Sequence, residues 1–193
     1  LYVVLTPIIA YLFLKKKISK WDWISAILAT IGLGLLSFKG FGIGLGEFLV
    51  FISAILFAIH ILALSEWASD LDVYALATFQ LGTCALITFA ASQISGFKAP
   101  PDSGVWKAIL FTAVFATAFA FIVHTWAQSF MPATTVAVIL TLESVFAAAF
   151  GLIFLSEALT FKIAFGGLLV LVAMYLIIYF ESKNALPEVS YHD

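Results

Sequence analysis

The chain has 193 residues, of which 64% are hydrophobic and 10% are charged. A soluble domain carries about 25% charged residues, so this composition and the mean hydropathy of +1.15 exclude the ordinary soluble class. The net charge of −2 also excludes a large basic surface, and we expect no nucleic-acid partner.

Continuous apolar runs recur along the chain and predict membrane-spanning helices. A bilayer core of about 30 Å requires about 20 helical residues, whereas membrane strands would show alternating polarity. Seven helical segments are predicted, at roughly 1–14, 22–38, 43–65, 73–95, 106–130, 132–155 and 161–181. The predicted fold is therefore an all-α, polytopic helical membrane protein embedded in a lipid bilayer.

The first segment is too short to span the bilayer, and the chain begins with Leu1 rather than methionine. We therefore expect the chain to begin inside a membrane helix, with the preceding helices missing. At the other end, residues 182–193 are predicted to form a polar C-terminal tail.

A cluster of lysines follows the first segment and consists of Lys15, Lys16, Lys17 and Lys20. Loops rich in lysine favour the cytoplasmic side of a membrane. Counting the crossings from this loop places the loops near Lys39, Lys98 and Thr160 outside and the C-terminal tail inside.

No reactive cluster is visible in the sequence. Cys84 is the single cysteine and is expected to be a buried, unreactive thiol. The chain has no phosphate-binding loop, no metal-binding spacing of histidines or cysteines, and no arginine. We therefore expect no cofactor, no metal and no enzymatic activity.

One internal repeat is visible. Residues Leu5–Ala10 and the loop residues Ile18-Ser19 resemble Leu142–Ala147 and Leu159-Thr160, if a gap of four residues is allowed. The copies are five helices apart, an odd number, so they are predicted to be inverted in the membrane. Inverted repeats are typical of transporters, whose substrate site lies between the repeats near the midplane.

Several stretches resemble the EamA-type transporters of the drug/metabolite transporter superfamily. They are Leu1–Pro7, Gly32–Ser37, Gly46–Val50, Leu142–Ala148, Ser156–Thr160 and Gly166-Gly167. The resemblance implies a ten-helix fold of two inverted five-helix repeats, of which the chain is a truncated form. Residues 1–38 would then be the end of the first repeat, with part of helix four and helix five. Residues 43–181 would be the second repeat, helices six to ten.

The resemblance also implies that the missing N-terminal half is needed for function. One departure concerns Ser144, because the family usually has proline after the glutamate that corresponds to Glu143. The kink that this proline would produce is therefore in question, although serine can bend a helix mildly.

Glu143 is the first candidate for a functional residue, because it lies near the middle of the segment 132–155. An ionised side chain at the bilayer centre costs about 2.5–3.5 kcal/mol on insertion scales, so such residues usually face a partner or a water-filled cavity. Two interpretations stay open. Glu143 binds a proton or a cationic substrate in a cavity, or it fixes helix packing through a hydrogen bond.

Three further candidates for the substrate or ion pathway are Thr117, His124 and Gln128, which form a polar stripe at helical spacing. Such a stripe either lines a cavity or hydrogen-bonds to a neighbouring helix. His60 is the last candidate, although a lone histidine is often only a packing residue.

The resulting hypothesis is a transporter that moves a small metabolite or drug by alternating access. Export is the expected direction, and coupling to a proton gradient is one option. The alternatives are a non-transporting membrane scaffold or assembly subunit and, third, a membrane enzyme. We expect an integral protein of a bacterial cytoplasmic membrane, and homo-oligomer formation is compatible with these features.

The topology can be tested by single-cysteine labelling of intact cells in a Cys84→Ser background. Because Lys17 is expected inside, Lys17→Cys should react with a membrane-impermeant reagent only after the cells are lysed. Strong labelling of Lys17→Cys in intact cells would show that the proposed orientation is wrong.

Overall fold

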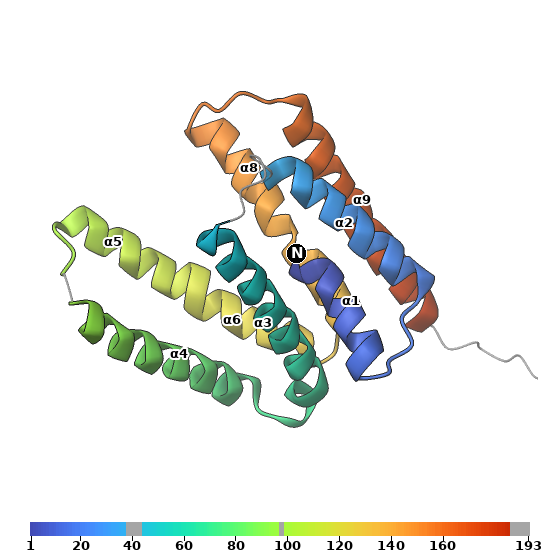
Figure 1. Cartoon of the computed structure of the whole chain (residues 1–193), viewed down its shortest axis with the longest axis horizontal. Helices are drawn as coiled ribbons and strands as arrows, with labels where there is room; N and C mark the ends of the chain where they lie inside the picture. Colours follow the sequence, from blue (N-terminus) through green and yellow to red (C-terminus); the bar gives the residue numbers. More distant parts are fainter. Residues whose placement is uncertain (38–43, 97–98, 186–193) are drawn as a thin grey trace, which may run out of the picture. The chain divides into compact units, whose positions relative to one another are not determined.

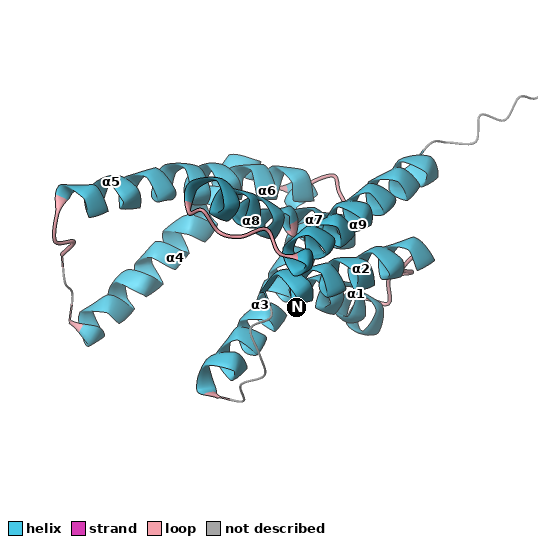
Figure 2. Ribbon diagram, turned by 90° about the horizontal axis from the view of Figure 1, so that it is seen from above, coloured by secondary structure: helices cyan, strands magenta, loops and turns pink. Residues whose placement is uncertain are grey.

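The computed structural model describes residues 1–37, 44–96 and 99–185, and these residues form helices joined by loops (Figures 1 and 2). The elements are α1 (Tyr2–Phe13), α2 (Lys20–Ser37), α3 (Leu45–Trp67), η1 (Ala68–Asp70), α4 (Val73–Ser95), α5 (Ser103–Phe111), η2 (Thr112–Phe119), α6 (Ala120–Gln128), α7 (Ala133–Leu140), α8 (Leu142–Phe154) and α9 (Phe161–Ala185). The predicted all-α class is confirmed for the described residues. The predictions about Lys39, Lys98 and residues 186–193 lie outside them.

Five stretches are long and apolar enough to cross a membrane: Leu45–Asp70, Val73–Ile94, Ser103–Gln128, Ala133–Phe154 and Phe161–Lys183. They agree with five of the predicted segments. The α2 helix is not among them, because its 18 described residues include Lys20 and Asp22 in the first turn.

Four details differ from the sequence-based expectations. The predicted helix 106–130 contains a π-helical segment, η2, and the predicted helix 132–155 is interrupted at Thr141. The α9 helix continues to Ala185, beyond the predicted end of the segment 161–181. Cys84 is exposed rather than buried, because few side chains of α4 are covered by the described chain.

The described residues divide into two units. Unit 1 comprises residues 1–62 and the chain from Pro132 onward, and unit 2 comprises Ala63–Met131. Each unit is treated by itself below.

The α2 and α9 helices of unit 1 pack side by side and antiparallel (Figure 1). At one end, the rings of Trp21 and Phe180 stack with their centroids 3.6 Å apart. Further along, Gly32 and Gly166 bring the two backbones together. A Cβ at Gly32 would lie 2.7 Å from the Gly166 carbonyl oxygen and 2.8 Å from a methyl group of Val170, so only glycine fits there.

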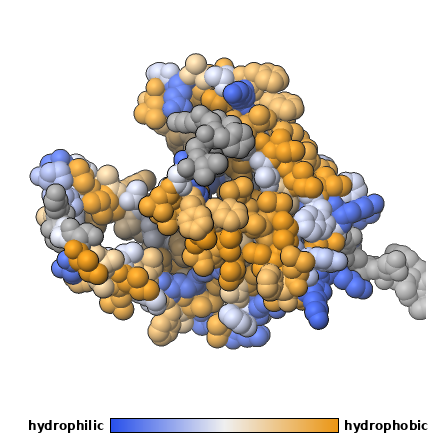
Figure 3. Space-filling view, in the orientation of Figure 1, coloured by the Kyte–Doolittle hydropathy of each residue, from blue (hydrophilic) through white to orange (hydrophobic). Residues whose placement is uncertain are grey.

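The buried core of unit 1 is built largely from small and β-branched residues. One cluster joins α1, α2, α7 and α9 and contains Val3, Ala26, Ala29, Val138, Ala173 and Ile177. Many large apolar side chains lie on the outside instead, as the hydrophobic colouring of the visible face shows (Figure 3). Small residues at helix contacts and large apolar residues outside are the distribution expected in lipid.

The α1 helix ends in a corner with two backbone hydrogen bonds to one carbonyl. The Ala10 carbonyl accepts the N–H groups of Leu14 and Lys16, both at 3.2 Å. Lys15 between them has a left-handed φ of 51°, a conformation common just after helix C-termini. The Ser19 hydroxyl then accepts an N–H from the first turn of α2 at 3.2 Å, as an N-cap side chain does.

The α8 helix ends in the same kind of corner. The Gly151 carbonyl accepts the N–H groups of Leu155 at 3.0 Å and Glu157 at 3.3 Å. Ser156 between them has a φ of 53°. The Thr160 hydroxyl then accepts an N–H from the first turn of α9 at 3.3 Å.

The two corners therefore correspond residue by residue, with Ala10 matching Gly151 and Ser19 matching Thr160. This correspondence supports the internal repeat but corrects its alignment. The gap of four residues that the sequence similarity required is not needed across the corner. Because the equivalent helices α2 and α9 run antiparallel, the two copies within unit 1 have opposite directions, as an inverted repeat requires.

The close contact of α2 and α9 gives a direct stability test. Gly32→Ala and Gly166→Ala should each destabilise the protein by about 1–3 kcal/mol, because the added methyl group forces the backbones apart. Thermal unfolding in detergent measures the effect.

Two glycines close by in the sequence, Gly34 and Gly167, supply matched controls for this test. A Cβ at Gly34 would meet nothing within 4 Å, and a Cβ at Gly167 would meet Val145 at an ordinary 3.9 Å. Gly34→Ala and Gly167→Ala should therefore be neutral or slightly stabilising, since alanine favours helix. Equal effects in the two pairs of variants would contradict the proposed contact.

Candidate functional site

Glu143 lies at the interruption of a membrane span. The α7 helix ends at Leu140, Thr141 lies between the helices, and Glu143 occupies the first turn of α8. The Thr141 hydroxyl donates to the Val138 carbonyl, and the Ser144 N–H donates to the Thr141 carbonyl at 3.1 Å. These bonds join residues three apart rather than four, which winds the chain more tightly than an α-helix. The helix is therefore interrupted here without a proline.

The Glu143 side chain is exposed on the surface of the described chain. It is close enough to Tyr2 to act on it electrostatically. The Tyr2 ring meets Phe57 edge-on, with centroids 4.9 Å apart, and Phe57 contacts the His60 ring at 6.1 Å. Tyr2 of α1 and the residues Phe57 and His60 of α3 therefore form a row of ring contacts in unit 1.

His60 is only half-buried, and it packs against Phe57 as the packing interpretation predicts. The negative charge of a carboxylate at the first turn of α8 is also favourable towards the helix dipole. Both the structural and the functional interpretations of His60 and Glu143 thus have a physical basis in unit 1.

Unit 2 contains the other polar group, on one face of α6. His124 is 9% exposed, Gln128 is 2% exposed, and Thr125 beside them is fully buried. Gln80 of α4 donates through Nε2 to the Thr125 hydroxyl at 3.4 Å. The polar face of α6 therefore meets a polar residue of the neighbouring helix.

Thr117 is separated from this polar face. It lies in the π-helical segment η2 and is exposed, whereas His124 and Gln128 are buried. The expected stripe assumed a regular α-helix from Thr117 to Gln128. The backbone hydrogen bonds of a π-helix span one residue more than those of an α-helix. The regular α-helical spacing that the stripe requires is therefore not kept within η2.

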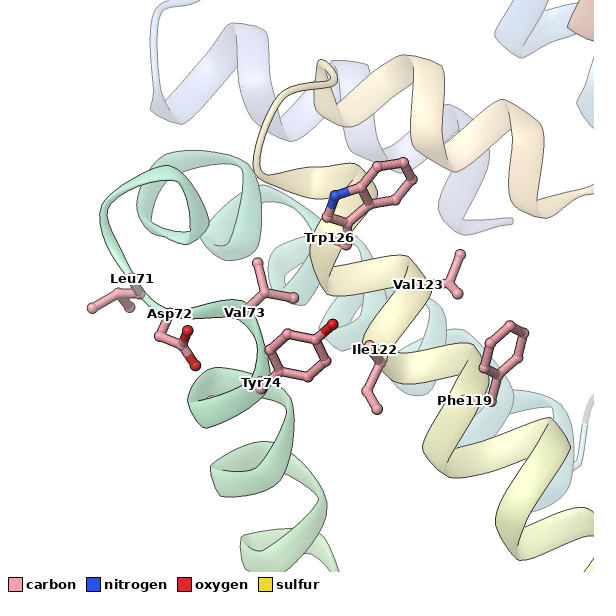
Figure 4. A pocket seen from close by; sticks show the side chains of 8 residues that line it. All are labelled: Leu71, Asp72, Val73, Tyr74, Phe119, Ile122, Val123 and Trp126. Carbon is pink, nitrogen blue, oxygen red and sulfur yellow. The ribbon is translucent and has the colours of Figure 1, made fainter.

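The opposite face of α6 lines a cavity of about 670 Å³ (Figure 4). Its walls come from the start of α4 and from η2 and α6, with Leu71, Asp72, Val73, Tyr74, Phe119, Ile122, Val123 and Trp126. The lining is mainly apolar and aromatic. The Asp72 carboxylate is already engaged there, because it accepts the Ala75 N–H at 2.7 Å as the N-cap of α4.

A third polar contact joins α7 to α9 in unit 1. The Thr135 hydroxyl donates to Oε2 of Glu181, and Asp22 is close enough to act electrostatically on Glu181. The Asp22 carboxylate also accepts the Ser19 N–H at 2.9 Å. The predicted segment 161–181 ended at Glu181, and no partner was predicted for this residue.

Sequence reasoning also missed Tyr2, Phe57, Gln80 and Thr125. The signal for Gln80 was present, because it is a polar residue within an otherwise apolar segment, as His124 is. Tyr2 and Phe57 carried no such signal, since aromatic residues are abundant throughout the chain.

These observations define an integral, multi-pass helical membrane protein with polar groups placed within its spans. Residues 44–179 match the EamA-like transporter family, and the chain belongs to this family. The resemblance found in the sequence is thereby confirmed.

Two relatives from Archaeoglobus fulgidus, each named "Uncharacterized transporter", are similar to the chain. One is 33% identical over 177 residues, which cover 91% of the chain and 57% of the relative. The other is 28% identical over 156 residues, which cover 79% of the chain and 53% of the relative. The chain thus spans a little over half the length of these relatives. No solved structure matches it significantly.

Proposed function

We propose that the protein transports a small metabolite or drug across the membrane by alternating access. The observation that carries this proposal is Glu143, a carboxyl group exposed at an interruption in the middle of a membrane span. A charged group in contact with lipid at this depth is costly, so a polar pathway beside Glu143 is its favourable environment. Interrupted helices at such pathways are a common feature of transporters.

The pathway is proposed to include His60, His124, Gln128 and Thr117 as well as Glu143. We propose export as the direction of transport. We also propose coupling to protons, because a carboxyl group that opens to each side in turn can bind a proton on one side and release it on the other. No catalytic residue is assigned, in keeping with membership of a transporter family.

We propose that the complete transporter needs further N-terminal helices, which would precede residues 1–38. The relatives are longer than the chain, which supports this proposal. We place the protein in the cytoplasmic membrane of the cell. The relatives reported above are archaeal, so the comparisons do not favour the expected bacterial membrane.

Glu143→Gln tests the proton-coupled role in the complete natural chain. Glutamine keeps the shape and the hydrogen bonding but cannot titrate, so the variant should reach the membrane normally and lose pH-dependent flux by at least about tenfold. Flux into reconstituted vesicles at several pH values is the measurement.

Glu47→Gln is the matched control, because Glu47 is an exposed carboxylate at the start of α3 that accepts the Gly44 N–H at 3.0 Å. It should leave flux and its pH dependence unchanged. Unaltered pH dependence in Glu143→Gln would leave only the packing role for Glu143.

A second experiment concerns the 193-residue chain by itself. We expect no flux after its reconstitution, because alternating access requires both members of the inverted-repeat pair. The complete natural chain, reconstituted at the same density, is the positive control. Equal flux from both proteins would refute the need for further helices, and no flux from either would favour the scaffold alternative.

A further inference from the structure

The Gln128 amide is buried and has no hydrogen-bond partner among the described residues. Only 2% of the residue is exposed, and neither Oε1 nor Nε2 bonds to any part of the chain that the structure describes. Oε1 of Gln80 is likewise buried and unbonded among the described residues. Most buried polar atoms in proteins are paired, so this concentration of unpaired amide atoms within unit 2 requires an explanation.

The hydrogen bonds of Gln80 determine which of its atoms is left over. Its Nε2 donates to the Leu76 carbonyl at 3.2 Å and to the Thr125 hydroxyl at 3.4 Å. A carbonyl oxygen can only accept, so the nitrogen must face Leu76 and Oε1 must be the unpaired atom. Gln80 therefore offers one acceptor beside Thr125.

Thr125 connects the two amides. It contacts Gln80 of α4 through its hydroxyl and stands one helical turn before Gln128 on α6. The group formed by Gln80, Thr125 and Gln128 is called the amide cluster below. It offers the Gln80 acceptor together with the acceptor and the two N–H donors of Gln128.

We propose that the amide cluster binds an uncharged hydrogen-bonding group, a carboxamide or a hydroxyl, of the transported solute. This inference deepens the proposed transport function and depends on it. The solute would supply partners for the buried atoms that are unbonded among the described residues.

The charges on the two helices that carry the cluster narrow the class of ligand. The helices α4 and α6 contain no lysine, aspartate or glutamate, so neither supplies a permanent charge to balance an ion. A carboxylate has only acceptors and cannot pair with Oε1 of Gln80. A carboxamide has both donors and an acceptor, so it offers a partner of the right kind to each of the two amides.

The position of the amide cluster indicates a site where the solute first binds, near one membrane surface, rather than the central substrate site. Gln128 is the last residue of the span Ser103–Gln128, and Gln80 lies in the first half of the span Val73–Ile94. Both therefore lie towards the same end of their antiparallel spans. The lysine-based topology places this end on the cytoplasmic side, where an exporter takes up its solute.

The first experiment needs no ligand. Gln128→Met in the complete natural chain replaces the unpaired amide with an apolar side chain of similar length. Removing an unpaired buried group should raise the unfolding temperature of the empty protein, by about 2–4 °C. Gln93→Met is the control, because Gln93 is an exposed glutamine on the same helix as Gln80, and it should cause no rise. A fall in the unfolding temperature of Gln128→Met would show that Gln128 has a structural partner and would overturn the inference.

The second experiment uses probes of matched shape: nicotinamide and nicotinate, acetamide and acetate, and lactamide and lactate. At least one amide should raise the unfolding temperature of the wild-type chain, while its carboxylate counterpart should not. Gln128→Met and Gln80→Leu should weaken the binding of that amide at least about tenfold, and Gln93→Met should not. Binding of no amide, or equal binding of amide and carboxylate, would overturn the assignment.

A flux assay separates this inference from the proposed function. Suppose that the wild-type chain transports a solute and that the Gln80 and Gln128 variants transport it equally well. The amide cluster is then not a solute site, and the transport proposal stands. If the wild-type chain transports nothing while the amide still binds to the cluster, the transport proposal fails.

Discussion

The approach of α2 to α9 at Gly32 and Gly166 is the constraint on which unit 1 depends. In lipid, apolar side chains gain little by leaving their surroundings, so helices associate where small residues let the backbones meet closely. The contact of the two glycines places α9 alongside α2. The ring stack of Trp21 on Phe180 then lies along the same pair of helices, and the bond of Thr135 to Glu181 joins α7 to α9.

Two polar side chains depart from what is usual in membrane proteins, where charged groups avoid lipid and buried polar groups are hydrogen-bonded. Glu143 is an acidic group exposed at mid-span, and Gln128 is a buried neutral amide with no partner in the part of the chain that the structure describes. Local conflicts of this kind are retained in proteins mainly where function requires them. Under the two proposals above, Glu143 would carry the transported proton and Gln128 would pair with an uncharged group of the solute.

The helix boundaries could be predicted well from the sequence, because the lengths of apolar runs follow directly from bilayer thickness. The predicted segment 73–95 coincides with α4, for example. The interruptions could not be predicted in this way. The break at Thr141 depends on which local hydrogen bonds form, and the π-helical turns of η2 separate Thr117 from His124 and Gln128. Gln80 was accessible to the same reasoning as His124, but its partner Thr125 emerges only from packing.

The π-helical segment η2 has a consequence for how this chain can change in length. Each π turn accommodates one more residue than an α turn, because its hydrogen bonds reach one residue further. Loss of a single residue between Thr112 and Phe119 can therefore be absorbed by a return to α-helical bonding. The faces presented by α5 and α6 would then keep their directions. A deletion elsewhere in a regular span would rotate every following side chain, so η2 is the place where the span Ser103–Gln128 best tolerates shortening.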